Sequence, residues 1–157
     1  MKKGKLLLNW QKEPVGVYLG HNKVFYIKSQ SQSYLNNKQM RALFYQESGL
    51  EGANLTETYL CGANLTGANL TGADLTGADL YRANLTGVDL YRANLLHADL
   101  ACANLNGANM SYANLVGANL SYADLRGANL RGANLSYAMY DKSTIWPVGF
   151  DRSKLSY

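Results

Sequence analysis

Two pairs of residues in the sequence have side chains that catalysis would need. Asp79 and Asp99 are carboxylates, a residue type that works in pairs in acid–base sites, and Cys61 and Cys102 are the only cysteines of the chain. The chain has just two histidines. A metal cluster or a Ser-His-Asp arrangement therefore has too few parts, and no glycine-rich phosphate motif precedes a helix. The sequence predicts no catalytic residue, no metal site and no cofactor.

A five-residue repeat decides where these side chains are placed. From Leu50 to Leu135 a large apolar residue stands at every fifth position, and it is leucine everywhere except at Met110. Alanine stands two residues earlier in most pentads, Asn or Asp lies between them, and glycine is the second residue after the leucine in 10 of the 18 pentads. A step of five would scatter the leucines around a helix and would send alternate leucines to opposite faces of a strand. Ala-Asn-Leu is therefore predicted to be a three-residue strand followed at once by a turn, which glycine favours.

Strand and turn units of this length predict an all-β fold, a parallel β-solenoid whose bore is filled by leucine and alanine. The outward slot between them holds Asn or Asp, whose short side chain can bond to neighbouring backbone as it does in turns. Asp79 and Asp99 occupy this slot, so a structural role is predicted for both. The predicted core comprises Leu55, Leu65, Leu75, Leu85, Leu95, Leu105, Leu115, Leu125 and Leu135.

The run Ala-Asn-Leu-Thr-Gly-Ala-Asn-Leu-Thr-Gly at 63–72 resembles the pentapeptide-repeat proteins, which are abundant in bacteria and especially in cyanobacteria. The resemblance covers residues 48–157 and implies a right-handed quadrilateral β-helix with four pentads per coil. The segment from Tyr140 to Asp151 is similar to the terminal segment of many members, in which aromatic residues close the last coil. A degenerate C-terminal cap is thus expected at about 138–157. The five-residue phase is expected to continue inward through Tyr140, Ile145, Phe150 and Leu155.

Residues 1–47 lack the repeat and are predicted to form a separate N-terminal unit. Val15–Leu19 and Val24–Ile27 flank a plausible turn and predict a small β-hairpin. A helix over about 36–48 is expected to cap the first coil, because the end of a solenoid leaves an exposed apolar layer. Whether the hairpin belongs to that cap or forms a separate adaptor stays open.

The charge of the chain is divided unevenly between these two parts. Residues 1–47 carry eight Lys and Arg against two Glu, a net charge of +6, whereas residues 48–157 carry seven basic and nine acidic residues, a net charge of −2. The basic residues are scattered rather than arranged in a stripe, which argues against nucleic acid as the partner.

Several pentads have other residues in the two positions where Thr-Gly is usual. With four pentads per coil, these residues lie together on two adjacent sides of the solenoid. Exposed tyrosine, arginine and aliphatic side chains are typical of the centres of protein interfaces. The plainer interpretation is a solvent-exposed cation–π pair between Arg92 and Tyr112, worth about 0.5–1 kcal/mol. The predicted partner-binding residues are Tyr91, Arg92, Leu96, His97, Tyr112, Val116 and Arg131.

These observations predict a non-catalytic rigid scaffold that binds another protein and has no small-molecule substrate. The alternative comes from the resemblance, because some pentapeptide-repeat proteins mimic DNA, bind DNA gyrase and protect it from inhibitors. The weak net charge of residues 48–157 and the arginines at 82, 92, 126 and 131 argue against such mimicry.

The sequence also predicts a cytoplasmic location. No apolar run approaches the roughly 18 residues that a membrane span requires. The short apolar stretch after the N-terminal lysines is not followed by a small-residue cleavage site. Two cysteines predicted to lie too far apart for a disulfide fit a reducing compartment.

Overall fold

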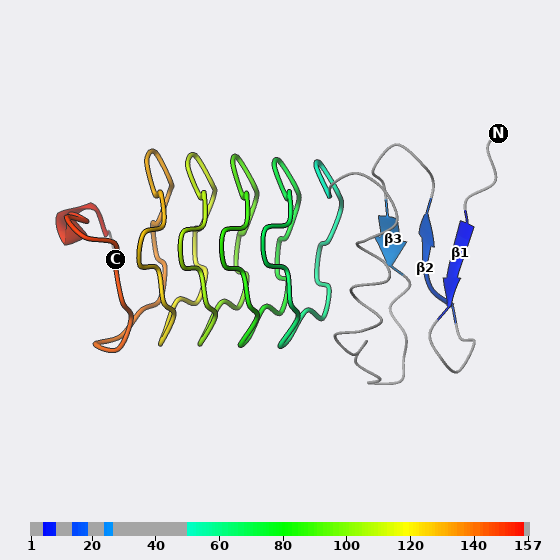
Figure 1. Cartoon of the computed structure of the whole chain (residues 1–157), viewed down its shortest axis with the longest axis horizontal. Coiled ribbons are helices and arrows are strands. Elements are labelled where there is room, and N and C mark those ends of the chain that lie inside the picture. The colour runs from blue at the N-terminus through cyan, green and yellow to red at the C-terminus, as the bar shows by residue number, and fades with distance from the viewer. Residues whose placement is uncertain (1–4, 9–13, 19–23, 27–49, 156–157) are drawn as a thin grey trace.

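The computed structural model describes residues 5–8, 14–18, 24–26 and 50–155 of the 157-residue chain (Figure 1). The helix expected over 36–48 lies outside the described residues, as does the turn expected between the second and third N-terminal strands.

Three short strands precede the repeat region. They are β1 (Lys5–Leu8), β2 (Pro14–Tyr18) and β3 (Val24–Tyr26), and they form an antiparallel sheet in the order β1-β2-β3. Pro14 opens β2 opposite Leu8, where the register of the β1–β2 pair shifts. This position suits proline, which lacks a backbone N–H and is confined to strand starts, edges and irregular points of a sheet.

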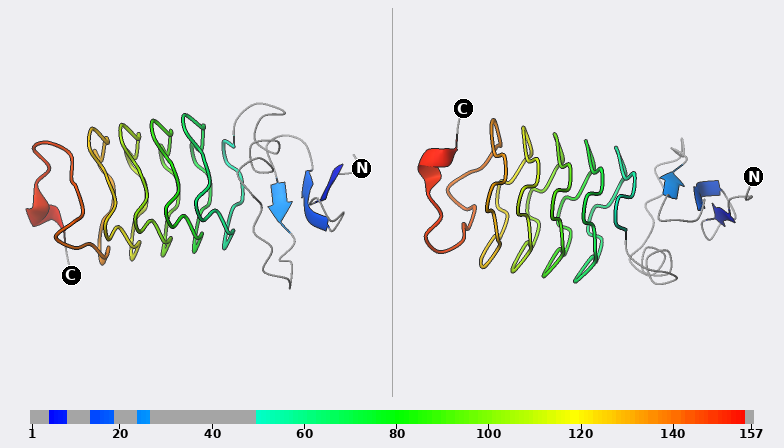
Figure 2. Two further views of the ribbon diagram at one scale, coloured as in Figure 1. Left: turned by 60° about the horizontal axis from the view of Figure 1, so that its bottom comes forward. Right: turned by 90° about the horizontal axis from the view of Figure 1, so that it is seen from above.

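Residues 50–155 form a tower of stacked coils, seen from three directions in Figures 1 and 2. Parallel bridges join each outward residue to the residue 20 positions later, from Asn54–Asp74 to Asn119–Met139. Four pentads therefore make one coil, and the tower has four walls, which we number in chain order. Wall 1 carries Leu50, Leu70, Leu90, Met110 and Leu130; wall 2 carries Leu55, Leu75, Leu95, Leu115 and Leu135; wall 3 carries Leu60, Leu80, Leu100 and Leu120; and wall 4 carries Leu65, Leu85, Leu105 and Leu125. The right-handed sense of the coil stays a prediction.

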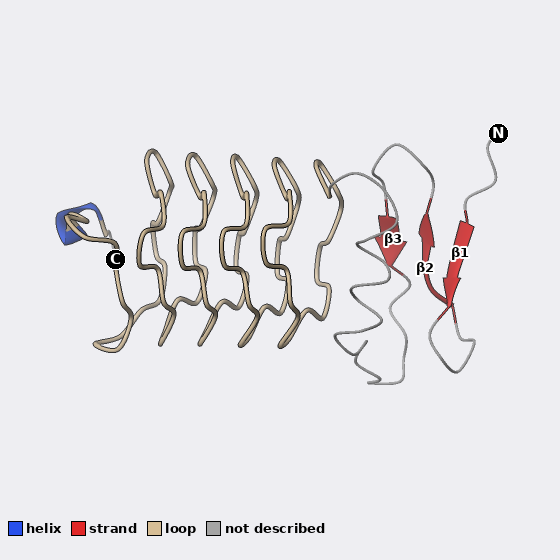
Figure 3. Cartoon of the chain, in the orientation of Figure 1, coloured by secondary structure: helices blue, strands red, loops and turns tan. Residues whose placement is uncertain are grey.

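Each pentad contributes a single bridged residue to its wall, so the tower consists of isolated bridges and turns (Figure 3). The N–H of Leu75 donates to the carbonyl of Asn94 in the next coil at 2.7 Å, and the N–H of Asn94 donates back to Ala73 at 2.8 Å. The N–H of Ala78 then closes the turn onto the carbonyl of Leu75 at 3.0 Å. The three-residue strand predicted for Ala-Asn-Leu is thus shortened to one bridge, because the backbone bends directly after each leucine.

Leucine and alanine fill the bore of the tower. Each of the nine leucines of the predicted core is at most 5% exposed. Thr58 occupies one alanine slot, and its buried hydroxyl donates a hydrogen bond to the carbonyl of Leu55 at 2.7 Å. Thr144, which precedes the bridged Ile145, is buried in the equivalent slot and donates to the carbonyl of Leu120 at 2.9 Å. The interior is therefore an apolar core in which both threonine hydroxyls keep hydrogen-bond partners.

The five-residue phase slips by one residue at the C-terminal end. Asp124 bridges to Ile145, 21 residues later, so that Ile145 faces outward at 45% exposure and Trp146 faces inward at 8%. The expectation that Ile145 continues the inward leucine positions is wrong. The cause is Asp141, whose carboxylate accepts the amide of Tyr122 at 3.2 Å. One coil lower the equivalent amide of Cys102 donates to a backbone carbonyl, so the aspartate side chain replaces a main-chain acceptor and allows one extra residue.

Aromatic side chains close this end of the bore. The Trp146 ring stacks on Phe150 with centroids 4.7 Å apart, and Tyr140 meets Trp146 edge-on at 5.6 Å. A 3-10 turn, η1 (Arg152–Lys154), follows, and Leu155 is buried after it. Within the described residues no helix is both long and apolar enough to cross a membrane.

Candidate protein-docking site

The outward carboxylates serve the turns of the tower. Asp79 and Asp99 bridge to each other one coil apart on wall 3, as their slots predict. The side-chain Oδ1 of Asp79 accepts the amide of Tyr81 at 3.0 Å, and that of Asp99 accepts the amide of Ala101 at 3.0 Å. This is the bond that Asn and Asp make in turns, and nearly every pentad repeats it. In the part of the chain that the structure describes, no three residues of the types His, Cys, Asp and Glu gather as a metal site would require.

Cys61 and Cys102 are free thiols, both on wall 3. Partial burial raises the pKa of the Cys61 thiol, Asp79 raises it further, and the Arg82 guanidinium opposes them. A raised pKa keeps the thiol protonated at neutral pH, whereas a nucleophilic cysteine needs a lowered one.

Three of the predicted partner-binding residues meet on wall 1. The rings of Tyr91 and Tyr112 contact edge to face, with centroids 5.9 Å apart and planes at 85°. The Cζ atom of Arg92 lies 5.1 Å from the centroid of Tyr91. The cation–π pair expected between Arg92 and Tyr112 is therefore wrong in its partner, because the guanidinium folds back onto the preceding Tyr91 ring, which Tyr112 also contacts.

The remaining residues extend this cluster around the corner and along the wall. Leu96 and Val116 lie one coil apart on wall 2, both half-buried, beside the exposed His97. Arg131 is exposed one coil beyond Tyr112, and its backbone carbonyl accepts the amide of Tyr112 at 2.9 Å. We call the seven residues Tyr91, Arg92, Leu96, His97, Tyr112, Val116 and Arg131 the corner patch.

Two glycines make room for two rings of the corner patch against the backbone of the next coil. The ring of Tyr112 covers the backbone of Gly132, where an added Cβ would come within 2.8 Å of it. The ring of His97 covers Gly117 in the same way, in even closer contact. Both glycines also have positive φ, so any other residue there would be strained as well as blocked.

Three residues of the corner patch have a backbone conformation that is unfavourable for residues other than glycine. Arg92, His97 and Tyr112 have φ values of 55°, 55° and 59°, the left-handed region that glycine adopts freely. They stand in the second slot after the leucine, which is glycine in ten other pentads. All eight non-glycine residues with positive φ in 50–155 lie on walls 1, 2 and 3, whereas wall 4 keeps glycine at 67, 87, 107 and 127. In this second slot, side chains are therefore confined to walls 1, 2 and 3, at a cost in strain.

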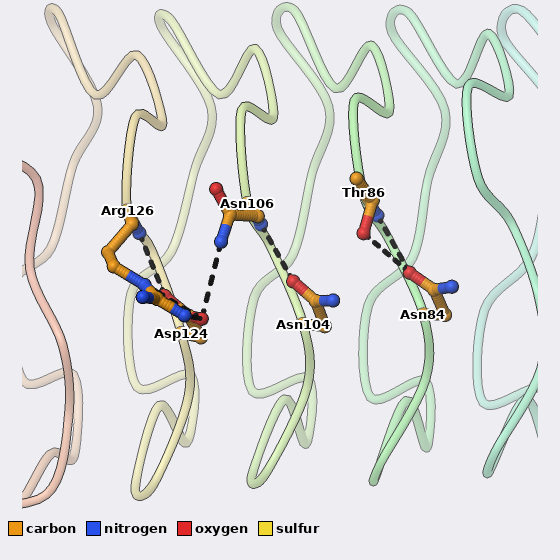
Figure 4. Close-up of polar contacts among 6 residues, drawn as sticks. All are labelled: Asn84, Thr86, Asn104, Asn106, Asp124 and Arg126. Atoms are coloured by element: carbon orange, nitrogen blue, oxygen red, sulfur yellow. Dashed lines mark hydrogen bonds and ion pairs between the residues drawn. The ribbon is translucent and has the colours of Figure 1, made fainter.

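The arginines of wall 1 differ from the arginine of wall 4. Arg126 is held by a bidentate interaction with Asp124, with Nε to Oδ1 at 2.9 Å and Nη2 to Oδ2 at 2.6 Å (Figure 4). This hydrogen bond lowers the pKa of the Asp124 carboxyl, against the opposing effect of its partial burial. Among the described residues, Arg92 and Arg131 form no ion pair, so their charge is open to a partner.

A second tyrosine–arginine pair stands on the opposite wall and was not among the predicted site residues. On wall 3, the Cζ atom of Arg82 lies 5.0 Å from the centroid of Tyr81, the same arrangement as Arg92 on Tyr91. The signal in the sequence is the dipeptide Tyr-Arg repeated after ten residues, which is half a coil. Because ten residues are half of the 20-residue coil, identical residues ten positions apart lie on opposite walls.

The chain is similar to pentapeptide-repeat proteins in both sequence and structure. The family model for pentapeptide repeats matches residues 50–80, 78–113 and 98–136. No curated protein sequence matches the chain. Among solved structures, the pentapeptide repeat protein Rfr23 of the cyanobacterium Cyanothece 51142 is 42% identical over 59% of this chain and 63% of its own, with a TM-score of 0.59.

Two further structures resemble the chain less closely in shape. A pentapeptide repeat protein of the Arabidopsis thaliana thylakoid lumen is 32% identical over 56% of this chain and 65% of its own, with a TM-score of 0.49. HetL, of the cyanobacterium Nostoc, is 40% identical over 57% of this chain and 54% of its own, with a TM-score of 0.42. The chain thus spans less than two thirds of the length of these structures. With the family model matched over more than half of its residues and the coil of four pentads present in its structure, the chain belongs to the pentapeptide-repeat family.

Proposed function

We propose that this protein is a non-catalytic scaffold that binds another protein at the corner patch. The observation that carries the proposal is the left-handed backbone of Arg92, His97 and Tyr112. Each would be relieved by glycine, the residue that most pentads have there, and strained conformations of this kind typically cost about 1–3 kcal/mol. Of the eight residues kept at such a cost in 50–155, these three lie together with other members of the corner patch, and this grouping is best explained by what they contact.

The chemistry of the corner patch supports a protein partner. Tyrosine and arginine are the residue types enriched among interface residues that contribute most to binding, and Leu96 and Val116 add apolar area beside them. The edge-to-face tyrosines and the stacked Arg92 are already ordered by one another, so less side-chain entropy is lost on binding. The rigid backbone of bridged coils holds the seven residues in fixed positions.

The test is a triple variant, Tyr91→Thr, Arg92→Gly and Leu96→Thr, which installs residues that suit these slots. Affinity capture from cells, read out by quantitative mass spectrometry, should find partners of the wild type that the variant retains at least about 30-fold less strongly. The matched control is Tyr81→Thr with Arg82→Gly, which removes the same residue types from wall 3. Equal retention by the triple variant would show that the corner patch is not the docking site.

The gyrase-binding alternative is tested by a supercoiling assay with added protein. Protection or inhibition of gyrase would replace the scaffold proposal. The mixed charge of the walls supports the scaffold, because Arg82, Arg92 and Arg131 stand without carboxylate partners in the described part of the tower, where a mimic of DNA needs negative charge. The two free thiols fit the cytoplasmic location that the sequence predicts.

A further inference from the structure

The exposed aliphatic side chains of the tower gather on its last coil. Among the described residues, the large aliphatic side chains that are exposed are Met139 at 55%, Ile145 at 45% and Val148, which is fully exposed. Met139 and Ile145 stand in the outward slot, which holds Asn or Asp in every pentad from 54 to 134 except at Tyr59. An aliphatic side chain there gives up the hydrogen bond of the turn and leaves apolar surface in water. Grouped apolar surface of this kind marks a site of interaction.

These side chains surround one corner of the last coil, which is drawn in orange and red in Figure 1. Met139 is bridged on wall 3 and Ile145 on wall 4. The turn that joins the two walls carries Lys142, which is exposed and forms no ion pair among the described residues. One coil below this turn lies Tyr122, which is 62% exposed. We call the five residues Tyr122, Met139, Lys142, Ile145 and Val148 the apical patch.

The charge of the tower is graded from one end to the other. Residues 50–89 carry one basic and five acidic residues, a net charge of −4, and residues 90–129 carry two of each. Residues 130–155 carry four basic and two acidic residues, a net charge of +2. The two carboxylates at this end, Asp141 and Asp151, accept hydrogen bonds from backbone amides. An anionic surface would therefore attract the last coil and repel the first two.

We propose that the apical patch docks this protein on an anionic lipid bilayer. Aliphatic side chains that flank a basic residue suit the boundary between lipid headgroups and acyl chains, because the former lose contact with water and the latter meets the anionic headgroups. Tyrosine is enriched at the same depth of a membrane. The exposed Arg152 adds a second cation at this end.

Shape and charge favour a bilayer over a protein as the occupant of the apical patch. The patch surrounds a convex corner, and a fluid bilayer adapts to such a corner without a matching groove. A second copy would bring one positively charged end against another. Docking of this kind leaves the corner patch accessible, because that patch surrounds the corner between walls 1 and 2, on the opposite side of the tower. Lipid binding and protein binding are therefore independent of each other.

The experiment is flotation of the whole chain with vesicles of phosphatidylcholine that contain about 30% phosphatidylglycerol, an anionic lipid. The wild type should float with these vesicles, bind vesicles of pure phosphatidylcholine more weakly, and be released as salt is raised. The triple variant Met139→Asn, Ile145→Asn and Val148→Ser should weaken binding to the anionic vesicles at least about 30-fold. Lys142→Gln should weaken it about 5-fold, and on the anionic vesicles alone.

The triple variant should fold, because asparagine is the usual residue of the outward slots and serine suits an exposed turn. A thermal melt no lower than that of wild type verifies this. The control variant, Leu96→Thr with Val116→Thr, removes aliphatic side chains from the corner patch instead. It should bind vesicles as wild type does while its capture of protein partners weakens, so the two proposals fail separately.

Three results of the flotation would overturn the proposal. They are a wild type that does not float with anionic vesicles, a triple variant that floats undiminished, and a control variant that loses lipid binding. Light scattering without vesicles adds a fourth. A wild-type mass of twice 17.2 kDa that the triple variant halves would assign the apical patch to a second copy instead of a bilayer.

Discussion

The choice between asparagine and aspartate in the outward slot follows from what lies one coil below. The amide of Asn114 donates to Asn94 at 2.8 Å, and the amide of Asn94 donates to Asp74 at 3.2 Å. On wall 1, Asn109 donates to Asp89 at 3.0 Å in the same way. Asparagine both accepts from the turn and donates downward, whereas an ionised aspartate can only accept. Aspartate therefore suits the foot of each side-chain ladder.

Two walls depart from this rule: on wall 4 Asp124 lies above Asn104, and on wall 3 two aspartates follow one another, from which a prediction follows. Asp99 lies above Asp79, so one carboxylate faces another without a donor between them. Asp99→Asn supplies the missing N–H and removes a like-charge contact, while the new side chain still accepts from Ala101. The free energy of unfolding should rise by about 0.5–1 kcal/mol, measured by urea denaturation at neutral pH. Asp74→Asn, at the foot of its ladder, is the control and should change little. A less stable Asp99→Asn would contradict the ladder rule.

The stability of the C-terminal end should depend on pH through Asp141. Burial on its own would raise the pKa of this carboxyl, but the hydrogen bonds donated by Tyr122, Ser143 and Thr144 outweigh it and hold the pKa below its ordinary value. A carboxyl whose folded-state pKa is lowered stabilises the fold above its unfolded pKa, and that contribution is lost as the pH falls.

The variant Asp141→Asn isolates this effect. The melting temperature of wild type should fall between pH 5 and pH 3, around the ordinary aspartate pKa of about 4. The variant should start lower at pH 7, because a neutral acceptor binds the three donors less strongly. Its melting temperature should then fall less steeply with acid than that of wild type. Parallel curves for the two proteins would exclude Asp141 as the source.

At the scale of the coil, inward and outward slots tolerate very different substitutions. Leu100 is fully buried in the bore, and Leu100→Lys would place a charge there without a partner, at a cost of several kcal/mol. Thr71→Lys, in an outward slot on wall 1 where the hydroxyl makes no hydrogen bond among the described residues, should change stability by no more than about 0.5 kcal/mol. Thermal melts of the two variants compare them, and similar shifts would contradict the inward assignment of the leucines.

The coil is also the element that the sequence predicts best. The five-residue period predicts a solenoid with leucine in its bore, and the resemblance to the family implies four pentads per coil; the structure has both. The slip at Ile145 escaped prediction because Ile145, Phe150 and Leu155 keep the five-residue spacing by sequence alone. Only the bond from Tyr122 to the Asp141 side chain reveals that one residue has been inserted. Likewise, the 20-residue spacing predicts that Arg92 and Tyr112 are neighbours. The rotamer that turns Arg92 onto Tyr91 depends on side-chain packing, which the repeat does not determine.

At the scale of the whole molecule, the tower should accept a change of length in units of one coil. Bridges join residues 20 apart, and each coil contacts only the coils above and below it. Inserting a second copy of residues 98–117 after 117 should therefore give a taller, folded protein with a melting temperature at or above that of wild type. A second variant with one residue deleted from the insert should be destabilised, because the coil that carries the deletion cannot keep all of its residues 20 positions from their bridge partners. Circular dichroism melts distinguish the two, and equal stability would contradict the register.

The fixed spacing of the bridges also shapes how the chain is made. Because each outward residue bonds to a position only 20 residues away, a coil can dock as soon as its own pentads have left the ribosome. During synthesis the tower can therefore grow coil by coil from its N-terminal end. At every moment the newest coil exposes the open top of the bore, and this lasts until the Trp146 and Phe150 rings emerge and cover it. A nascent chain that stalls before Trp146 would present a fresh apolar layer and an unpaired edge to its neighbours on the same polysome.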